Sequence, residues 1–269
     1  MCIAAFLWRA HPLYPLLLLQ NRDEYHHRPT EPLAWWGGCD VLGGRDAVAG
    51  GTWLGCSRAG RVAFLTNVLE LHALPEAKSR GQLPVLFLES LKTPKEFADM
   101  LVKEAHMYNG FNLILADLST KTMLYISNRP KGEPIVVQEV PPGIHVLSNA
   151  NLNSPWPKVN RLKLNFKQQL EKYGDDEIPV EELLENLMRD TVRAEINRLP
   201  GICSRDWEYN LSSIFVEVDT PLGCYGTRSS IGLTVRANGE VSLYETYLED
   251  DIWKNKTELS HFKSKNSLK

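Results

Sequence analysis

Apolar and polar positions predict several antiparallel hairpins along this chain. Three pairs of β-prone apolar segments are each separated by a short turn: 2–8 with 15–21, 52–57 with 61–67, and 229–236 with 240–247. Gly60 lies in the second turn, and Asn238-Gly239 joins the third pair as a dipeptide that favours two-residue hairpin turns. We expect each pair to form neighbouring strands of an antiparallel sheet.

Helices are expected in pairs between groups of short strands. The predicted helices cover 80–91, a segment that opens at Thr93, 154–173 and 179–199, and the further strands are 111–117, 122–127, 134–137, 144–148 and 211–218. Thr93 and Glu96 flank Pro94 as a capping box, which marks the start of the second helix. Residues 28–51 are rich in glycine, proline and tryptophan and are predicted to form a long loop.

This arrangement indicates the α+β class. Strands cluster in hairpins and helices come in pairs, whereas parallel βαβ units would alternate single strands with single helices. We expect sheet packed on sheet with helices outside. The sequence shows no internal repeat and no clear linker, so residues 1–253 are predicted to form one domain, followed by a charged, loosely held tail over 254–269.

Composition narrows the classes of partner. Of the 269 residues, 43% are hydrophobic, and the net charge of −3 comes from interspersed acidic and basic residues. Nucleic acid and anionic membrane surfaces are therefore not expected partners. The apolar run Leu16–Leu19 is far shorter than the roughly 20 residues of a membrane span, and no signal peptide is recognisable. We expect no transmembrane segment and a cytosolic or organelle-matrix location; the oligomeric state is left open.

The cysteines and histidines show no metal-binding spacing. The five cysteines are scattered and include no CxxC pair, which argues against a zinc site and against a disulfide framework. His26 and His27 are the natural haem or metal ligands, but adjacent side chains diverge along an extended chain and no companion ligand stands at metal spacing. We interpret them as exposed loop histidines and predict no metal site.

Cys2 has two interpretations. It is either a small buried residue that begins a strand or a nucleophile. Removal of Met1 would give Cys2 both a thiol and an α-amine, and the amine titrates near pH 8, so it can accept the thiol proton. The thiolate would attack a carbonyl carbon. Asn67 and Asn149 each stand at the end of a predicted strand, where side-chain amides could hold the resulting oxyanion.

Four consecutive polar residues close the second apolar segment. Asn21, Arg22, Asp23 and Glu24 follow a run of leucines, on the strand expected to pair with the one that Cys2 begins. Charged groups at this position could orient the α-amine and lower the pKa of the thiol. A solvated turn is the alternative interpretation, because turns commonly carry such residues.

Seven motifs in combination resemble the NRDE family. They are, in chain order, Cys2 after Met1, "NRDE" at 21–24, "GGTWLG" at 50–55, "LTN" at 65–67, "YNGFNLI" at 108–114, "LSN" at 147–149 and "YGTRSS" at 225–230. The resemblance covers nearly the whole chain. This family is in turn similar to the N-terminal nucleophile hydrolases, especially the branch of choloylglycine hydrolase and penicillin V acylase. That similarity implies a four-layer αββα sandwich.

The resemblance also implies a set of site residues. Carried over by motif, the nucleophile and its assisting residues are Cys2, Arg22, Asp23, Asn67, Asn149 and Arg228. In the hydrolase branch the arginine and the aspartate are separated along the chain, whereas Arg22 and Asp23 are adjacent. Asn21 or Glu24 could therefore fill one of these roles, and both are candidates for contact with the substrate.

Two functions are compatible with these residues. The first is an amide or thioester acyl hydrolase or transferase, which requires no cofactor. The second is a non-catalytic protein that binds haem or an acyl-coenzyme A ester. Trp35, Trp36 and Trp53 lie beside glycines and could line a hydrophobic pocket for either ligand, with core or loop anchoring as the alternative. The resemblance implies roles in Golgi organisation, protein secretion and lipid homeostasis, in the cytoplasm, the mitochondrion or at the Golgi.

Overall fold

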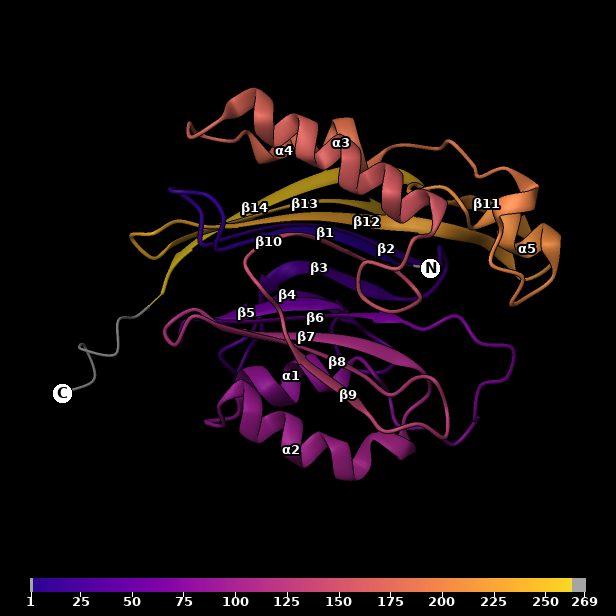
Figure 1. The fold of residues 1–269 in the computed structure, drawn as a ribbon, viewed down its shortest axis with the longest axis horizontal. Helices are drawn as coiled ribbons and strands as arrows, with labels where there is room; N and C mark the ends of the chain where they lie inside the picture. The colour runs from indigo at the N-terminus through magenta and orange to yellow at the C-terminus, as the bar shows by residue number, and fades with distance from the viewer. Residues whose placement is uncertain (1, 263–269) are drawn as a thin grey trace. The chain divides into compact units, whose positions relative to one another are not determined.

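The computed structural model describes residues 2–262, which form two compact units whose segments alternate along the chain. The first unit contains 2–28, Leu69–Leu71 and Pro142–Leu259, and the second contains Pro29–Val68, His72–Pro141 and 260–262. Each unit has its own seven-stranded sheet and its own helices, which are drawn in Figure 1.

The sheet of the first unit has the strand order β10-β1-β2-β12-β13-β14, with β11 paired to β12. Its strands are β1 (Ile3–Trp8), β2 (Leu16–Tyr25), β10 (Gly143–Leu147), β11 (Glu217–Thr220), β12 (Gly223–Val235), β13 (Glu240–Glu249) and β14 (Ile252–His261). The predicted hairpins at the two ends of the chain are confirmed as the antiparallel pairs β1–β2 and β12–β13. Ile3 opposes Asn21 in the β1–β2 pair, so the start of β1 lies beside the polar end of β2.

Helices cover one face of this sheet, and they are α3 (Pro157–Tyr173), α4 (Val180–Leu183) and the π-helix η2 (Leu184–Met188). The short 3₁₀ helix η3 (Ile196–Arg198) and α5 (Arg205–Asn210) follow, with α5 at the end of the sheet near β11 (Figure 1). Apolar side chains recur every fourth residue of α3, at Leu162, Phe166 and Leu170, and pack in one cluster with Ile3 and Leu17 of the sheet. Each such side chain contributes about 1.5–3 kcal/mol when fully buried, which holds α3 along the sheet in Figure 1.

The helix predicted over 179–199 is wrong beyond Met188. Asp190 ends it, because its carboxylate accepts a hydrogen bond from the Val192 N–H at 2.8 Å and forms a local turn. The Asp190 carbonyl accepts a further bond from the Phe215 N–H at 2.8 Å. These bonds hold the backbone after η2 against the segment before β11, so the helix does not continue.

The strand predicted over 211–218 is also mostly wrong, because regular pairing begins only with β11 at Glu217. β11 pairs with the first residues of β12 across Gly226. A Cβ at Gly226 would lie 2.0 Å from the Val216 carbonyl oxygen, so only glycine permits this close approach of the two backbones. The approach shapes the start of β12, which carries Thr227 and Arg228.

The sheet of the second unit has the order β3-β4-β5-β6-β7-β8-β9. Its strands are β3 (Thr30–Trp35), β4 (Leu42–Asp46), β5 (Leu54–Ser57), β6 (Arg61–Asn67), β7 (Phe111–Asp117), β8 (Thr122–Ser127) and β9 (Val136–Glu139). Helices α1 (Gln82–Glu89) and α2 (Pro94–Glu104), followed by the 3₁₀ helix η1 (Ala105–Met107), lie along one face (Figure 1). The predicted capping box is confirmed: the Thr93 hydroxyl accepts from the Glu96 N–H, and the Glu96 carboxylate accepts from the Thr93 N–H at 2.8 Å.

The long loop predicted over 28–51 is wrong, because it contains β3 and β4. The glycines that suggested turns instead permit close packing inside a strand. A Cβ at Gly43 would lie 2.5 Å from the Leu54 carbonyl oxygen, and one at Gly44 would lie 2.4 Å from the Trp53 ring. Glycine in a strand can mark such close contact as well as a turn.

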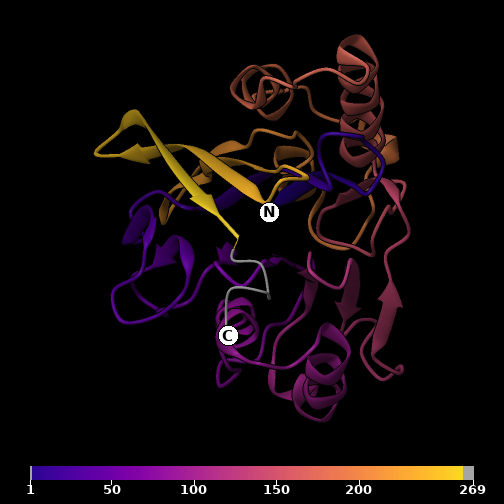
Figure 2. The ribbon, with the colours of Figure 1, turned by 90° about the vertical axis from the view of Figure 1, so that its left-hand side faces the viewer.

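The charged tail predicted as loosely held is a strand over 254–261. β14 follows β13 through Asp250 and Asp251, both of which have left-handed φ angles, 50° and 59°. The two strands form the extended yellow ribbon of Figure 2. Two consecutive residues with positive φ suit a tight hairpin turn. The rest of the predicted tail, 263–269, lies outside the described residues.

Gly226→Ala tests the close approach of β11 and β12. A methyl group there meets backbone that cannot rotate away, so we expect the free energy of unfolding to fall by roughly 1–3 kcal/mol in urea denaturation. Gly37→Ala is the matched control, because a Cβ at Gly37 meets no atom within 4 Å. The control should change stability by less than about 0.5 kcal/mol. Equal effects of the two substitutions would contradict the steric argument.

Candidate functional site

Cys2 lies immediately before β1 and is 7% exposed. Burial raises the pKa of the Cys2 thiol, and the Asp23 carboxylate raises it further. The Asp23 backbone N–H, which hydrogen-bonds the sulfur, and the Arg22 guanidinium lower this pKa. The net shift is upward, so ionisation of Cys2 at neutral pH requires a nearby base or a compensating positive charge.

Asp23 is buried near the end of β2, and its carboxylate is held in place by β12. The Thr227 hydroxyl donates to Asp23 Oδ1 at 2.7 Å. The oxygen of that hydroxyl accepts from the Val216 N–H at 3.0 Å, and the Thr227 N–H donates to the Val216 carbonyl at 2.7 Å. The structure therefore brings Cys2, Arg22 and Asp23 together, and it adds Thr227, which sequence reasoning missed although it lies in the "YGTRSS" motif.

The end of β10 brings an amide to the same place. Asn149 is buried, and its Oδ1 lies 2.9 Å from the Ser148 hydroxyl oxygen. That hydroxyl also lies 3.2 Å from the Cys2 carbonyl oxygen, so it can donate to either acceptor. The Asn149 carbonyl accepts from the Leu69 N–H at 2.8 Å, which fixes the backbone after β10. The predicted neighbourhood of Cys2 and Asn149 is thus present, and Ser148 connects the two residues.

Arg228 lies at a β-bulge of β12, between Thr227 and Ser229. Its Nη1 donates to the carbonyl oxygens of Tyr25 and His26, at 3.1 and 3.0 Å, and to that of Arg28. A single guanidinium nitrogen thus binds the backbone of the turn after β2. Arg228 lies at the same end of the sheet as Asp23, and its observed contacts hold this turn against β12.

The outer members of the polar cluster bind neighbouring parts of the fold. The Asn21 amide nitrogen donates to the carbonyls of Met188 and Ile214, at 2.8 and 3.1 Å, and its oxygen accepts from Ser230 at 2.7 Å. Glu24 accepts from the backbone N–H of Tyr25 at 2.8 Å and lies within 3.8 Å of Arg28. Asn21 therefore connects β2 to the chain after η2 and before β11, a structural role that the sequence did not reveal. Substrate contact by either residue stays a prediction.

Lys158 is a buried charged residue that sequence reasoning missed. It lies in the first turn of α3, is 2% exposed, and donates from Nζ to the Leu211 carbonyl at 3.0 Å. Burial lowers the pKa of Lys158 to about 8, while the negative charges of Asp23 and Cys2 raise it. The sequence signal was its spacing, because Lys158 stands four residues before Leu162 on the apolar stripe of α3.

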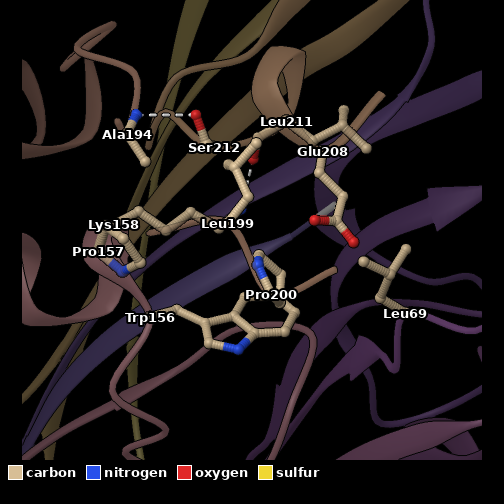
Figure 3. A pocket seen from close by; sticks show the side chains of 10 residues that line it. All are labelled: Leu69, Trp156, Pro157, Lys158, Ala194, Leu199, Pro200, Glu208, Leu211 and Ser212. Atoms are coloured by element: carbon tan, nitrogen blue, oxygen red, sulfur yellow. Dashed lines mark hydrogen bonds between the residues drawn. The ribbon is translucent and has the colours of Figure 1, made fainter. Parts of the chain in front are cut away.

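An apolar hollow lies next to this lysine. Its lining residues are Leu69, Trp156, Pro157, Lys158, Ala194, Leu199, Pro200, Glu208, Leu211 and Ser212, and its cavity volume is about 20 Å³. Figure 3 shows the lining side chains, with the Lys158 side chain running beside Leu199. The Glu208 carboxylate is occupied, since it accepts from the N–H groups of Gly201, Ile202 and Cys203.

Tyr225 adds an aromatic group to the surroundings of Cys2. Burial raises the pKa of Tyr225 well above its usual value, and the charges of Asp23 and Cys2 raise it further. The Tyr225 ring packs against Tyr25 and Trp207, with centroid distances of 5.1 and 5.5 Å. These rings give the end of β2 and β12 an apolar side beside its charged groups.

The remaining predicted site residues belong to the second unit. Asn67 is the last residue of β6, and Trp53 is buried against Gly44. Trp36 donates from its indole nitrogen to the Gly43 carbonyl at 2.9 Å, and Trp35 stacks with the Arg58 guanidinium at 3.5 Å. These contacts anchor Trp35 in β3, Trp36 just after it and Trp53 just before β5. Roles for Asn67 and the tryptophans in ligand binding stay predictions.

His26 and His27 lie in the turn after β2. His26 Nε2 is 4.0 Å from the Cys224 sulfur, and burial lowers the pKa of His26. His27 is exposed and packs beside Tyr25. Over residues 2–262, no group of three histidine, cysteine or acidic side chains is placed to hold a metal ion. None of the helices in that range has the length and apolar character needed to cross a membrane.

This arrangement suits nucleophilic acyl chemistry. The Asp23 carboxylate and the Arg22 guanidinium act on the Cys2 thiol, and the charge of Cys2 acts on the Lys158 ammonium. The Asn149 amide lies at the end of the adjacent strand. A thiolate stabilised by positive charge attacks carbonyl carbon, and an amide N–H can stabilise the oxyanion that forms. The groups near Cys2 can thus stabilise both the thiolate that attacks and the negative charge that forms on the carbonyl oxygen.

Comparison with known proteins gives consistent matches over the whole chain. A family model described as Transport and Golgi organisation 2 matches residues 1–250. The mouse Transport and Golgi organization 2 homolog is 36% identical over 265 residues, covering 93% of this chain and 94% of that protein. The human homolog is 34% identical over 280 residues, covering 98% and 97%. The Drosophila melanogaster protein is 24% identical over 263 residues, covering 91% of each chain.

Solved structures with a similar fold are also found. A mutant of the conjugated bile acid hydrolase from Clostridium perfringens aligns with a TM-score of 0.52 at 11% identity, over 97% of each chain. Another variant of that hydrolase aligns with the same score at 10% identity, over 96% of this chain and 97% of the other. At such low identity these matches show the fold alone. They confirm the predicted α+β fold of the N-terminal nucleophile hydrolases, the αββα class. With this fold and a family match over 1–250, the chain belongs to the Transport and Golgi organisation 2 family.

Proposed function

We propose that this protein is a cysteine N-terminal nucleophile enzyme that hydrolyses or transfers an acyl group from an amide or thioester metabolite. The observation that carries the proposal is the buried Cys2 at the start of β1, beside Asp23, Arg22 and Asn149. The shared fold supports it, since the structural neighbours are named as hydrolases of conjugated bile acids. The class of acyl donor, an amide or a thioester, is part of what we propose.

The first half of the proposed reaction acylates the cysteine. Removal of Met1 leaves Cys2 with a free α-amine, which takes the thiol proton. The Cys2 sulfur then bonds to the carbonyl carbon, and the carbonyl oxygen becomes an oxyanion that the Asn149 amide stabilises. The oxyanion collapses to a thioester on Cys2, and the amine or thiol of the substrate leaves with the proton from the α-ammonium.

The second half releases the acyl group. A water molecule, or an acceptor amine or thiol, gives its proton to the α-amine and attacks the thioester carbon. The carbon–sulfur bond breaks, and the Cys2 thiol is restored as the acid or the new acyl compound leaves. In this scheme Asp23 orients the α-amine, and Arg22 balances the charge of the thiolate. Arg228 is included in the site on the motif resemblance, and a role for Asn67 stays a prediction.

A non-catalytic carrier of haem or an acyl-coenzyme A ester is the second candidate. The apolar lining of the hollow beside Lys158 favours it, because that lining suits an apolar group without any chemistry at Cys2. The hollow, about 20 Å³ in volume, would have to widen to admit such a group. For either candidate, the names of the relatives connect the proposed activity to transport and Golgi organisation. We propose that the acyl or haem ligand serves lipid homeostasis and secretion from the cytoplasm, with association to mitochondria or the Golgi.

The state of the N-terminus gives the first prediction. If the α-amine of Cys2 is the base, intact-mass spectrometry of the protein purified from cells should show that most molecules lack Met1. The small side chain of Cys2 is compatible with that removal. Retention of Met1 on most molecules would exclude the proposed base, whatever activity the protein shows.

Turnover by Cys2 gives the second prediction. Wild-type protein should release thiol from acyl-coenzyme A esters or amine from N-acyl amides, and Cys2→Ala should reduce the rate to background, because no other group replaces the nucleophile. Cys224→Ala is the matched control, since Cys224 is half-buried on β12. Equal binding of haem or acyl-coenzyme A by wild type and Cys2→Ala, with no turnover by either, would favour the carrier.

Asn149→Ala gives the third prediction. Loss of an oxyanion donor typically lowers kcat by about 10²–10³. We expect a loss of this size in the acylation rate, with little change in KM, because the amide acts on the transition state. Asn160→Ala, on the exposed side of α3, is the control. An unchanged acylation rate in a folded Asn149→Ala variant would remove Asn149 from the mechanism.

A further inference from the structure

The backbone after β10 is held so that Asn149 lies next to Cys2. Leu147 opposes Ala4 in the β1–β10 pair, so the chain that continues from β10 runs beside the chain before β1. The Asn149 carbonyl accepts from the Leu69 N–H at 2.8 Å. These backbone contacts determine where Asn149 lies, but they do not determine which way its side-chain amide faces.

A side-chain amide has two chemically different ends. Its oxygen only accepts hydrogen bonds, and its nitrogen donates two. An amide that stabilises an oxyanion must therefore present Nδ2 to the substrate, because Oδ1 in the same place would repel the developing negative charge. Rotation of the amide by half a turn exchanges the two ends without moving the rest of the side chain. The orientation of the Asn149 amide thus decides whether this residue can act as proposed.

The Ser148 hydroxyl selects between the two orientations. It has a single proton, which can go to Asn149 Oδ1 at 2.9 Å or to the Cys2 carbonyl oxygen at 3.2 Å. Hydrogen bonds between two oxygens are usually about 2.5–3.0 Å long, so the contact with Asn149 Oδ1 fits better. Ser148 and Asn149 are 2% and 1% exposed, which limits competition from water for this bond. A hydroxyl that donates to Oδ1 holds this oxygen beside Ser148 and turns Nδ2 to the other side.

We propose that Ser148 is a positioning residue, whose hydroxyl binds Asn149 Oδ1 and so presents Nδ2 to the acyl oxygen during attack by Cys2. The inference rests on the proposed function, because it concerns how the oxyanion of that reaction is stabilised. In this role Ser148 acts through Asn149 and does not touch the acyl group. It was not among the site residues predicted from the sequence.

A second arrangement uses the same three residues. If the amide faced the opposite way, Nδ2 would donate to the Ser148 oxygen, and the Ser148 hydroxyl would donate to the Cys2 carbonyl. Ser148 would then hold Asn149 in an orientation that cannot stabilise an oxyanion. Removal of the hydroxyl would release the amide and leave the reaction unchanged or faster, whereas our proposal predicts a slower reaction.

The test is acylation of Cys2 by S-phenyl thioacetate, a small activated thioester, measured as release of thiophenol. Ser148→Ala should lower the acylation rate at saturation about tenfold with KM nearly unchanged, because without the hydrogen bond the amide populates both orientations. Ser148→Thr retains the hydroxyl and should restore most of the rate. Ser57→Ala, at a buried serine of β5, is the control and should leave the rate unchanged.

The double variant shows whether Ser148 acts through Asn149. An Asn149→Ala protein has no amide to orient at this position, so adding Ser148→Ala should change its rate less than about twofold. An equal loss in both backgrounds would overturn the proposal, because Ser148 would then act through Cys2 or through the fold. An unchanged or faster rate, or a change in KM alone, in folded Ser148→Ala would also overturn it. Ser148→Gly replaces Ser148→Ala if that variant does not fold.

A second measurement needs no turnover. In protein labelled with ¹⁵N at asparagine side chains, the NMR signal of the Asn149 amide is the one that Asn149→Ala removes. Ser148→Ala should shift this signal and speed the exchange of its protons with water, because Oδ1 loses the Ser148 hydroxyl. Ser57→Ala should leave the signal in place. An Asn149 signal that is the same in wild type and Ser148→Ala would contradict the assigned orientation.

The proposed function can fail separately. Wild-type protein that releases no thiophenol and forms no adduct on Cys2 would contradict the proposed enzyme, and a Ser148-dependent amide signal would then still support Ser148 as the residue that orients Asn149. Acylation that depends on Cys2 but is the same in Ser148→Ala would support the enzyme and overturn the role of Ser148.

Discussion

The antiparallel pairing of β2 with both β1 and β12 determines what surrounds Cys2. Ile3 opposes Asn21 in the first pair, so the residue before β1 lies beside Arg22 and Asp23. In the second pair Thr227 opposes Asp23, and its hydroxyl binds the carboxylate. A shift of one residue in either register would turn these side chains to the opposite face of the sheet. The site thus depends on strand pairing before it depends on any single polar contact.

Hydrogen bonds from the backbone and from neighbouring strands offset the burial of these polar groups. The Thr227 hydroxyl binds Asp23, Arg228 binds carbonyls of the turn after β2, and Asn21 binds the carbonyls of Met188 and Ile214. Lys158 differs, because its Nζ donates one hydrogen bond within residues 2–262 and burial lowers its pKa to about 8. Burial of this ammonium costs stability, because a cation loses its hydration there.

The sequence predicted the hairpins, the capping box and the neighbourhood of Cys2, Asp23 and Asn149, because periodicity and local turn chemistry are encoded within short segments. Predictions from the sequence were wrong where contacts between distant segments determine the local structure. Gly43 and Gly44 permit close packing inside β4, and the chain that ends its helix at Asp190 is also held by the bond from the Phe215 N–H to the Asp190 carbonyl, far along the chain. The structural use of Asn21 and the burial of Lys158 were hidden for the same reason, since both depend on partners from distant segments.

The most direct test of the account is where an acyl group becomes attached. The protein is incubated with an activated acyl thioester, quenched in acid during turnover, digested and analysed by mass spectrometry. The account predicts an acyl adduct on the Cys2 sulfur that hydroxylamine removes, as expected for a thioester, and none in Cys2→Ala. Turnover without an adduct on Cys2, or with an equal adduct in Cys2→Ala, would contradict the assignment of Cys2 as the nucleophile.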